Sequence, residues 1–591
     1  MTAEPVTERP HLRPGVAVTP LREGLHLRGR STSLTLEGSR SLPALWEVLS
    51  ARLDGDPAAT AETGHPKVEA ALATVTARLR EHDLLVDHPD GAGLPPWPGS
   101  VADRPGDAAA ALAAAHPVVA SADPDDATAR AVARALARGG ARPTVVAEPA
   151  LPAGQVLAVA GEPPVAVGLR YGPEGGFVTA PADPERARAD LAALAERLRP
   201  DSGGANGGSA PRALPLLLAA ATAQRLLCAV AGLPDPADPR DDPRLLAGRP
   251  AVLVAEARPL RAEHRPWAAG PGRAADPPED LDTALRRIAA LGDARLGVLD
   301  APSPGDLPQL PAALVTCRTP DGILAAGAAR TDLARLAAAV RAAELQAAAA
   351  DPGAAGRRVG ATVGAVDGVT VGFTVGIAVG AGPGHALGRA LRRAALAVPA
   401  APAAPGDGGD GGTPSGAPWR EHPQAGHWTA ALARRLGRDA ALTVRRLAGS
   451  AYLATVEGSR AVEATAADAV AVAALDALTR RTARDLGLSA IHHTSFSGAA
   501  APLAAAGQQL VDWVDEGWTS RWLAGLADRE ADLQTALLGL TGLRTAPWRP
   551  GTAAARPLAA ALAGCGFTAL VPAPALLPAP APAPAPAGGH R

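Results

Sequence analysis

The sequence predicts an α/β protein built from several domains. Its 591 residues exceed the roughly 100–200 that are typical of one domain. Hydrophobic residues make up 47% of the chain, enough for extended cores, and charged residues make up 20%. Segments in which apolar residues alternate are interleaved with segments in which they recur every three or four positions, the patterns of strands and helices. A fibre, a small disulfide scaffold and a wholly disordered chain are therefore excluded.

Charge and cysteine content narrow the class of protein. The chain has 57 basic and 59 acidic residues, and its only lysine is Lys67. This balance argues against a nucleic-acid partner, which requires a basic excess on one face. The three cysteines, Cys228, Cys317 and Cys565, show no paired spacing, so we expect neither a disulfide framework nor a cysteine-based zinc site. We therefore expect a cytoplasmic location. Residues 1–10 contain no signal-peptide core and no uninterrupted apolar run of about 18 residues follows, so no membrane partner is expected.

Segments rich in proline and glycine divide the chain. We predict three domains, over residues 1–92, 93–275 and 276–571, with a flexible insertion at 401–418. Residues 572–591 form a tail in which Pro and Ala alternate. Because proline fixes φ and removes a hydrogen-bond donor, this tail is expected to be extended.

The first domain is expected to contain a small sheet. Alternating apolar residues predict three short, half-buried strands around Val16–Val18, Leu25–Leu27 and Leu34–Leu36. A further strand is expected at Leu84–Val86. The sheet would need a helical partner to cover its apolar face.

Two helices are predicted to supply that partner. Apolar residues at helical spacing predict a helix over 42–53, capped by Ser41, and another over 67–82. Three strands followed by helices is a winged-helix-like order. Such a fold suggests DNA binding, but the second helix balances Arg78 and Arg80 with acidic residues, which disfavours phosphate contacts.

The same order resembles the leader-recognition element of ribosomally made peptide biosynthesis, a fold shared with the quinone-cofactor peptide chaperone family. The resemblance covers residues 10–90 and lies in RPGVAVTPLREGLHLRG and SLTLEG. In that family a leader peptide adds as a strand beside the third strand and packs against the third helix. The resemblance implies a peptide-binding edge and a groove wall, formed respectively by Ser33, Leu34, Thr35, Leu36 and Glu37, and by Leu72, Val75, Arg78 and Leu79. It places Arg78 opposite an acidic leader residue; the alternative is that these Leu and Val residues are simply core.

The second domain begins with a strand–helix–strand pattern over 117–121, 126–138 and 143–147, with Asp125 or Asp126 as the helix cap. A nucleotide site would need glycines between the first strand and its helix. The turn instead holds three aspartates and a proline, so the sequence argues against a nucleotide there.

Further along, the helix at 214–231 and the segment AVLVAEARPLRAEHRPW resemble the ThiF-like adenylating family, over residues 115–270. That family continues into a CxxC zinc pair, which this chain lacks after Trp267, and the glycine loop is also missing. The resemblance therefore implies a degenerate, doubly wound ThiF-like domain. ThiF-like relatives also suggest a homodimer.

A leader-recognition element followed by a degenerate ThiF-like domain resembles the partner proteins of YcaO cyclodehydratases, of the F-protein or ocin-ThiF-like type. Those partners bind the precursor's leader and deliver core Cys, Ser or Thr to the YcaO enzyme, which makes thiazolines and oxazolines with ATP, as in thiopeptide-type clusters. The resemblance implies that this chain is a non-catalytic subunit without a cofactor of its own. ATP and Mg²⁺ would lie on the YcaO-type partner.

Residues 276–571 are expected to form an α/β domain that docks this partner. Residues 297–345 faintly resemble the opening of a YcaO domain, and the tail resembles that family's terminal P-x-P-x-P. Magnesium and ATP require several carboxylates on neighbouring helical turns. The two predicted helices of this half offer few, namely Asp332, Glu344, Asp468 and Asp476. The alternatives are an ATP-dependent cyclodehydratase fusion and a winged-helix regulator.

Two further clusters of side chains could carry function. Residues 492–498 (HHTSFSG) contain histidine and serine but no nucleophile elbow, so we interpret them as a mobile polar loop. Trp513, Trp518 and Trp522 with Leu510 lie at near-helical spacing. Such a stripe is usually core, although an exposed part of it would anchor a partner.

Overall fold

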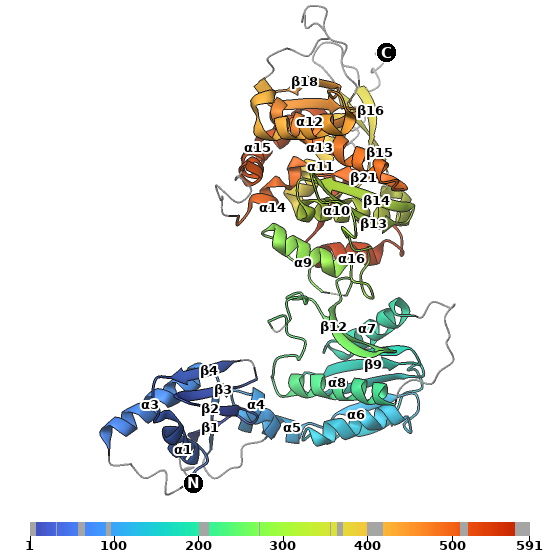
Figure 1. The fold of residues 1–591 in the computed structure, drawn as a ribbon. Helices are drawn as coiled ribbons and strands as arrows, with labels where there is room; N and C mark the ends of the chain where they lie inside the picture. The colour runs from blue at the N-terminus through green and yellow to red at the C-terminus, as the bar shows by residue number, and fades with distance from the viewer. Residues whose placement is uncertain are drawn as a thin grey trace, which may run out of the picture. The chain divides into compact units, whose positions relative to one another are not determined.

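The protein is a mixed α/β chain, shown as a ribbon in Figure 1. This computed structural model describes residues 8–30, 32–56, 65–89, 96–199, 212–240, 242–270, 272–354, 356–362, 370–398, 418–508 and 518–573. Two compact units are present: Met1–Asp242 with Ala251–His264, and Pro243–Pro250 with Arg265–Arg591. Nearly all of the predicted insertion at 401–418 and of the tail at 572–591 lies outside the described residues.

Where the structure describes the first part of the first unit, it forms two small antiparallel sheets. β2 (Ala17–Leu21), β3 (Gly24–Arg28) and β4 (Ser33–Glu37) pair in that order, as the alternation of apolar residues predicts. β1 (Glu8–Leu12) pairs with β5 (Leu85–Pro89). β1 was not predicted, because ERPHL contains a single large apolar residue and no alternation.

In the described part of this region, two helices pack with these sheets around a shared core. They are α1 (Leu42–Leu53) and α3 (Pro66–Glu81), which match the predicted helices to within a residue or two. The predicted cap at Ser41 is wrong, because that residue has helical φ and ψ and its side chain makes no capping bond. Arg52 on α1 donates to both carboxylate oxygens of Glu69 on α3, at 2.8 and 2.7 Å, and so ties the helices together.

The second part of the first unit is a seven-stranded sheet of order β12-β11-β10-β9-β8-β6-β7. Its strands are β6 (Val118–Ser121), β7 (Thr144–Ala147), β8 (Gln155–Ala160), β9 (Val165–Tyr171), β10 (Gly175–Val178), β11 (Ala251–Ala257) and β12 (Leu260–Pro266). β6 and β7 pair in parallel, whereas the pairs β6–β8, β8–β9, β9–β10 and β10–β11 are antiparallel. A doubly wound domain requires a mostly parallel sheet, so that detail of the prediction is wrong. The physical reason is that β8 and β9 are joined by a short turn, which allows only antiparallel pairing, while β6 and β7 are separated by a helix.

Helices cover both faces of this sheet. α6 (Ala127–Arg138) and α8 (Ala213–Val230) pack together on one side, and α7 (Pro184–Arg197) lies on the other (Figure 1). Asp126 caps α6 by accepting hydrogen bonds from the backbone N–H groups of Thr128 and Ala129, as expected. Two short helices, α4 (Pro96–Val101) and α5 (Pro105–Ala114), precede the sheet.

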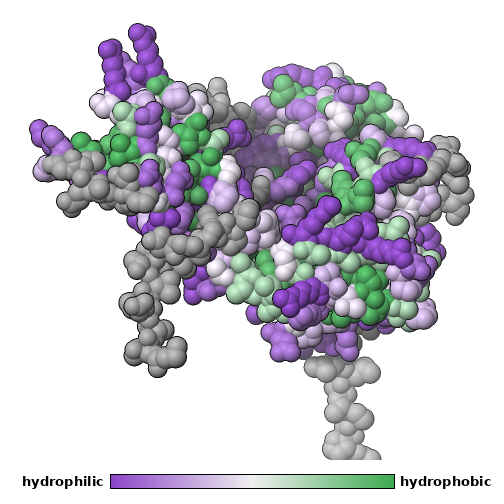
Figure 2. All heavy atoms as spheres, turned by 90° about the horizontal axis from the view of Figure 1, so that it is seen from below, coloured by the Kyte–Doolittle hydropathy of each residue, from purple (hydrophilic) through white to green (hydrophobic). Residues whose placement is uncertain are grey.

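α8 is the one helix among the described residues that is long and apolar enough to cross a membrane, a feature the sequence analysis did not recognise. Half of its most apolar window is buried inside the protein, where α8 packs on α6 and β9. A core helix of this kind passes the same length and composition test as a membrane span. On the face drawn in Figure 2, hydrophilic and apolar residues are interspersed over the coloured parts of the molecule.

Among its described residues, the second unit contains four small sheets. Their strand orders are β13-β14-β21, β18-β19-β20, β17-β23-β22 and β15-β16. The strands are β13 (Ala313–Thr319), β14 (Gly322–Ala328), β15 (Arg357–Thr362), β16 (Thr370–Val375), β17 (Ala378–Gly380), β18 (Leu442–Ala448), β19 (Ala451–Val456), β20 (Ser459–Glu463), β21 (Ala490–Ser495), β22 (Thr545–Pro547) and β23 (Thr568–Pro572). β21 pairs in parallel with β14, so residues 490–495 form a strand and the interpretation of 492–498 as a mobile loop is wrong over that stretch.

The helices of the second unit surround a large alanine- and leucine-rich core. They are α9 (Leu281–Leu291), α10 (Thr331–Ala350), α11 (Pro383–Ala397), α12 (Pro423–Leu436), α13 (Ala466–Asp485), α14 (Ala501–Ala505), α15 (Trp518–Thr541) and α16 (Arg556–Gly564). Trp522 on α15 is 5% exposed and belongs to this core, whereas Leu510 and Trp513 lie outside the described residues. α10 and α13 carry the four carboxylates that the sequence analysis singled out.

All three cysteines are buried and unpaired. Burial raises the pKa of Cys228 to about 11 and the pKa values of Cys317 and Cys565 to about 12. Since the thiolate is the reactive form, we expect the native chain at pH 8 to react slowly with a thiol reagent such as dithionitrobenzoate. The same chain in denaturant should release three equivalents of thionitrobenzoate at once, one for each cysteine. Fast labelling of the native chain would contradict the burial of the three thiols.

Candidate functional site

β4 is an outer strand of the first unit's three-stranded sheet. In the part of the chain that the structure describes, it pairs with β3 alone. The residues predicted to form a peptide-binding edge, Ser33–Glu37, are the whole of this strand. The structure therefore places these five residues together at one edge of the sheet.

The hydrogen-bond pattern fixes which backbone groups of β4 face outward. Gly29 donates to the carbonyl of Thr32 and Gly38 to that of Glu23, at 2.9 and 3.1 Å, at the two ends of the β3–β4 ladder. Because antiparallel pairs alternate between hydrogen-bonded and non-hydrogen-bonded, the pairs Leu27–Leu34 and Leu25–Leu36 are hydrogen-bonded. The N–H and C=O groups of the remaining residues, Ser33, Thr35 and Glu37, consequently point away from β3.

The opposite edge of the sheet, formed by β2, is different. In the register of β2 and β3, the backbone groups that face away from β3 are those of Val18 and Pro20. Proline has no N–H, so half of the donors on that side of β2 are missing. Of the two edges, β4 is the better template for another strand.

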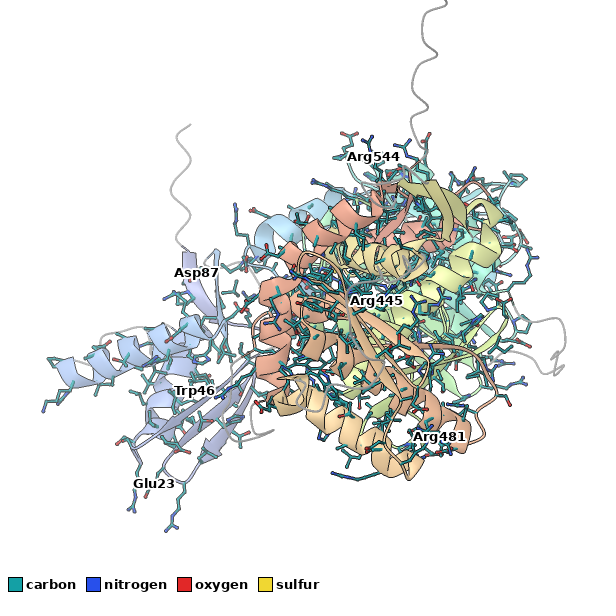
Figure 3. The ribbon with its side chains drawn as sticks, turned by 90° about the horizontal axis from the view of Figure 1, so that it is seen from above. Glu23, Trp46, Asp87, Arg445, Arg481 and Arg544 are labelled. Atoms are coloured by element: carbon teal, nitrogen blue, oxygen red, sulfur yellow. The ribbon has the colours of Figure 1, made fainter. Side chains whose placement is uncertain are left out.

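The side chains of β4 alternate between the two faces of the sheet. Leu34 is 8% exposed and Leu36 is half-buried, and both pack on the helices' side. Ser33, Thr35 and Glu37 are exposed. Figure 3 shows Glu23 at the tip of the β2–β3 hairpin and Trp46 of α1 on the helical side of the sheet, where it packs against the core. Thr35 Oγ1 lies 2.8 Å from His26 Nδ1 across the outer face.

The four residues predicted to form a groove wall all lie on α3. Leu72, Val75 and Leu79 are 3%, 8% and 0% exposed and belong to the core between the sheet β2–β3–β4 and the helices α1 and α3. Arg78 is exposed and forms an ion pair with Glu81, one turn ahead, at 2.7 Å. α3 and β4 meet at their ends, where Thr32 Oγ1 donates to the carbonyl of His82 at 2.5 Å.

In the second unit, the four carboxylates predicted from the sequence are all engaged by cations or donors. Asp332 pairs with Arg330, and Asp476 pairs with Arg480 at 2.7 Å. Asp468 is fully buried and accepts hydrogen bonds from Thr465, Trp522 and Arg529. Glu344 contacts three arginines, described next. No group of three or more His, Cys, Asp or Glu side chains suited to a metal ion occurs among the described residues.

Glu344 on α10 is the carboxylate with the most positive surroundings. Its Oε1 accepts from Arg389 at 2.9 Å and from the backbone N–H of Val379 at 3.0 Å, and its Oε2 accepts from Arg341 and Arg393. Burial raises its pKa, but the three guanidinium groups outweigh burial and hold the pKa at about 2. Glu344 is thus ionised at neutral pH and leaves a local surplus of positive charge.

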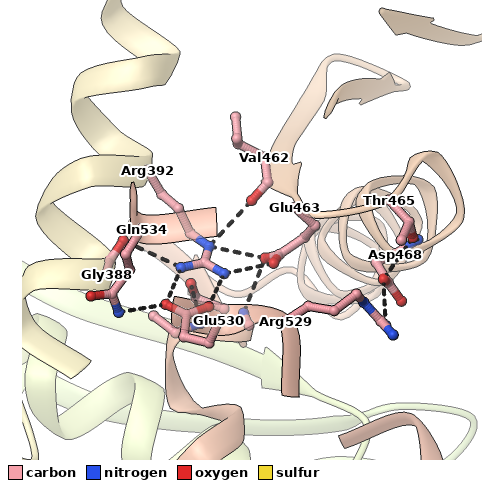
Figure 4. A network of polar contacts seen from close by, with 12 residues as sticks. Gly388, Arg392, Val462, Glu463, Thr465, Asp468, Arg529, Glu530 and Gln534 are labelled. Atoms are coloured by element: carbon pink, nitrogen blue, oxygen red, sulfur yellow. Dashed lines mark hydrogen bonds and ion pairs between the residues drawn. The ribbon is translucent and has the colours of Figure 1, made fainter. Parts of the chain in front are cut away.

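Arg392 on α11 has the opposite surroundings, with two carboxylates around one guanidinium (Figure 4). Its Nη2 lies 2.7 Å from Glu463 of β20 and 2.6 Å from Glu530 of α15, and its Nε also donates to the carbonyl of Val462. Burial lowers the pKa of Arg392, but the two carboxylates raise it well above its usual range. A Cβ at Gly388, one turn earlier, would lie 2.5 Å from Glu530 Oε1 and 2.9 Å from Ala499 Cβ, so a larger residue here would force the network to shift.

These ion networks were missed by the sequence analysis. Arg392 is separated from Glu463 by 71 residues and from Glu530 by 138, and no local spacing pattern predicts such contacts. The only available signal was the density of arginine on α11, ALGRALRRAAL, in a helix that otherwise consists mostly of Ala, Leu and Gly.

No protein-family model and no curated protein matches this chain. A solved structure described as "Heterocyclase in complex with substrate and Cofactor" is similar to it, with a TM-score of 0.46 and 12% sequence identity. The similarity covers 96% of this chain and 94% of that chain. At this TM-score and identity it does not assign an activity to the protein.

The buried ion network predicts a large stability effect. Arg392→Met would leave Glu463 and Glu530, which are 2% and 5% exposed, without their cation. We expect it to destabilise the second unit by about 3–5 kcal/mol, measured as earlier urea unfolding by tryptophan fluorescence. Arg484→Met, at an exposed position of α13, is the matched control and should change stability by less than about 0.5 kcal/mol. Equal effects of the two substitutions would contradict the network's role.

The second unit should also lose stability in acid, in two pH ranges. Burial lowers the pKa of His385 from 6.5 to about 3, so the unfolded chain binds a proton that the folded chain does not, and stability falls as the pH drops below about 6.5. The depressed pKa of Glu344 adds a loss below about 4.5. His385→Asn keeps an acceptor for the Ala381 N–H and should flatten the melting temperature between pH 6.5 and 5. A variant curve parallel to that of the wild type would contradict this assignment.

Proposed function

We propose that the chain binds the leader segment of a ribosomally synthesised precursor peptide by strand addition at β4. The rest of the chain then presents the peptide's core Cys, Ser and Thr residues to a YcaO-type cyclodehydratase, which forms thiazolines or oxazolines. The observation that carries this proposal is the free edge of β4, with the backbone groups of Ser33, Thr35 and Glu37 facing outward. The proposal is also supported by the order β2, β3, β4 and then α1 and α3, which agrees with the three strands and helices on which the family resemblance of residues 10–90 rests.

This edge is suited to bind an extended peptide with limited sequence selectivity. Three N–H and three C=O groups can pair with the backbone of any extended segment, at a net gain of about 0.5–1.5 kcal/mol for each hydrogen bond. Side chains on either side then add selectivity. A total of about −8 kcal/mol corresponds to micromolar binding, sufficient to raise the local concentration of the core peptide at a partner enzyme.

In this proposal the α3 residues Leu72, Val75 and Leu79 stabilise the sheet from the core, because they are almost fully buried. Selectivity for the leader would come from exposed positions. Arg78 could meet an acidic leader residue only by exchanging its contact with Glu81, which costs little because exposed ion pairs contribute about 0–1 kcal/mol.

The second unit is proposed to be the surface on which the partner enzyme docks. Its four conspicuous carboxylates are already neutralised by arginine or held by buried donors, which supports a role without magnesium chemistry of its own. ATP and Mg²⁺ would then be supplied on the partner. A cyclodehydratase fusion would need carboxylates that are free to bind the metal.

Thr35→Pro tests the proposal at a single backbone group. The Thr35 N–H faces away from β3, so proline removes a donor from the free edge without removing a hydrogen bond of the β3–β4 ladder. We expect the labelled leader of the precursor peptide encoded beside this gene to bind the full-length variant at least about tenfold more weakly, measured by fluorescence anisotropy.

Thr35→Val is the matched control for this experiment. It keeps the backbone donor and loses only the hydroxyl that contacts His26. We expect binding of the leader within about twofold of the wild type, and melting curves of both variants should show an intact fold. Unchanged binding by Thr35→Pro, or no binding by the wild type, would contradict strand addition at β4.

A further inference from the structure

A basic pocket lies in the second unit, outside the proposed peptide-binding edge. It has a volume of about 530 Å³, within the range of small-molecule sites. Its wall comes from α10, α11, β20, α13 and β21, together with Phe496 and Ser497. Six arginines line it, namely Arg341, Arg389, Arg392, Arg393, Arg460 and Arg480.

The arginines outnumber the carboxylates that compensate them. Those carboxylates are four, namely Glu344, Glu463, Glu530 and Asp476. The surplus is concentrated on the side formed by α10 and α11, where three guanidinium groups share Glu344. Arg460 adds an exposed guanidinium that has no carboxylate partner among the described residues.

Hydrogen-bond donors also remain unused in this wall. Arg389 is 6% exposed, and its buried Nε has no partner among the described residues. Arg341 donates to Glu344 through Nη1, and its other N–H groups have no acceptor among the described residues. A buried donor without an acceptor is destabilising, so an anionic ligand that supplied acceptors would be bound favourably here. Ser459, Ser495 and Ser497 add hydroxyl groups to the same wall.

We propose that this pocket binds a phosphorylated small molecule directly through guanidinium groups, without a metal ion. A phosphate group carries about two negative charges near neutral pH and presents several acceptor oxygens. Its geometry matches the arginine fork, which donates two parallel hydrogen bonds to one phosphate. The two surplus positive charges of the pocket therefore match the charge of one such group.

The proposed site contains no metal ion because the carboxylates of the pocket already bind other groups. Glu463 accepts from Arg392 and from the backbone N–H of Gly498, and Asp476 accepts from Arg480. A magnesium ion would have to displace these cations before it could coordinate the same oxygens. The arginines instead supply the positive charge that a metal ion supplies in other phosphate sites.

Isothermal titration of the full-length chain with sodium pyrophosphate tests this inference. We expect saturable binding that is the same within about twofold with EDTA present. Excess MgCl₂ should weaken it, because Mg²⁺ competes with the arginines for the phosphate oxygens. Tighter binding with Mg²⁺, or no saturable heat at millimolar pyrophosphate, would overturn the proposal.

Two variants locate the binding. Arg341→Gln and Arg460→Gln each remove one lining charge and should each weaken pyrophosphate binding about tenfold. Arg484→Gln, an exposed position of α13 that does not line the pocket, should leave it unchanged. Binding that survives in the Arg341/Arg460 double variant would place the anion elsewhere. Thr35→Pro should not alter pyrophosphate binding, so this proposal and the peptide-binding proposal can fail separately.

Discussion

Polar groups that are withdrawn from water must find partners, and much of this fold follows from meeting that requirement. In the second unit, Arg392 satisfies two buried carboxylates from distant segments and so holds α11, β20 and α15 together. In the first unit, Arg52 and Glu69 do the same for α1 and α3 at the rim of the core. The two candidate sites are different. The edge of β4 presents exposed backbone groups that have no partner strand among the described residues, and the arginine pocket has more guanidinium groups than carboxylates.

The edge of β4 and the arginine pocket differ in the chemical class of ligand that they can bind. At β4, the unmet groups are backbone N–H and C=O, which any extended peptide can satisfy regardless of its sequence. In the pocket, they are guanidinium donors, which require an anion of suitable size. A chain with both would hold a peptide at one site and respond to a small anion at the other.

In the first part of the first unit, the described helices and every described strand except β1 were predictable because each has a local apolar pattern, as in SLTLE of β4. β1 has no such pattern, and its pairing with β5 depends on contacts across more than 70 residues. The mostly antiparallel pairing in the seven-stranded sheet was missed because buried strands such as QVLAVA of β8 look alike in parallel and antiparallel sheets. The ion networks of Glu344 and Arg392 depend entirely on tertiary contacts. Glu344 was therefore named from the sequence without its arginine partners, and the network of Arg392 was not predicted at all.

The most direct test of the central claim is hydrogen exchange at single backbone amides, recorded with and without the leader peptide. Strand addition at β4 predicts that the amides of Ser33, Thr35 and Glu37 exchange more slowly when the peptide is bound, because their N–H groups become donors to it. The amide of Val18, on the other edge of the same sheet, should be unchanged. Protection at Val18, or at none of the β4 amides despite saturable peptide binding, would contradict the account.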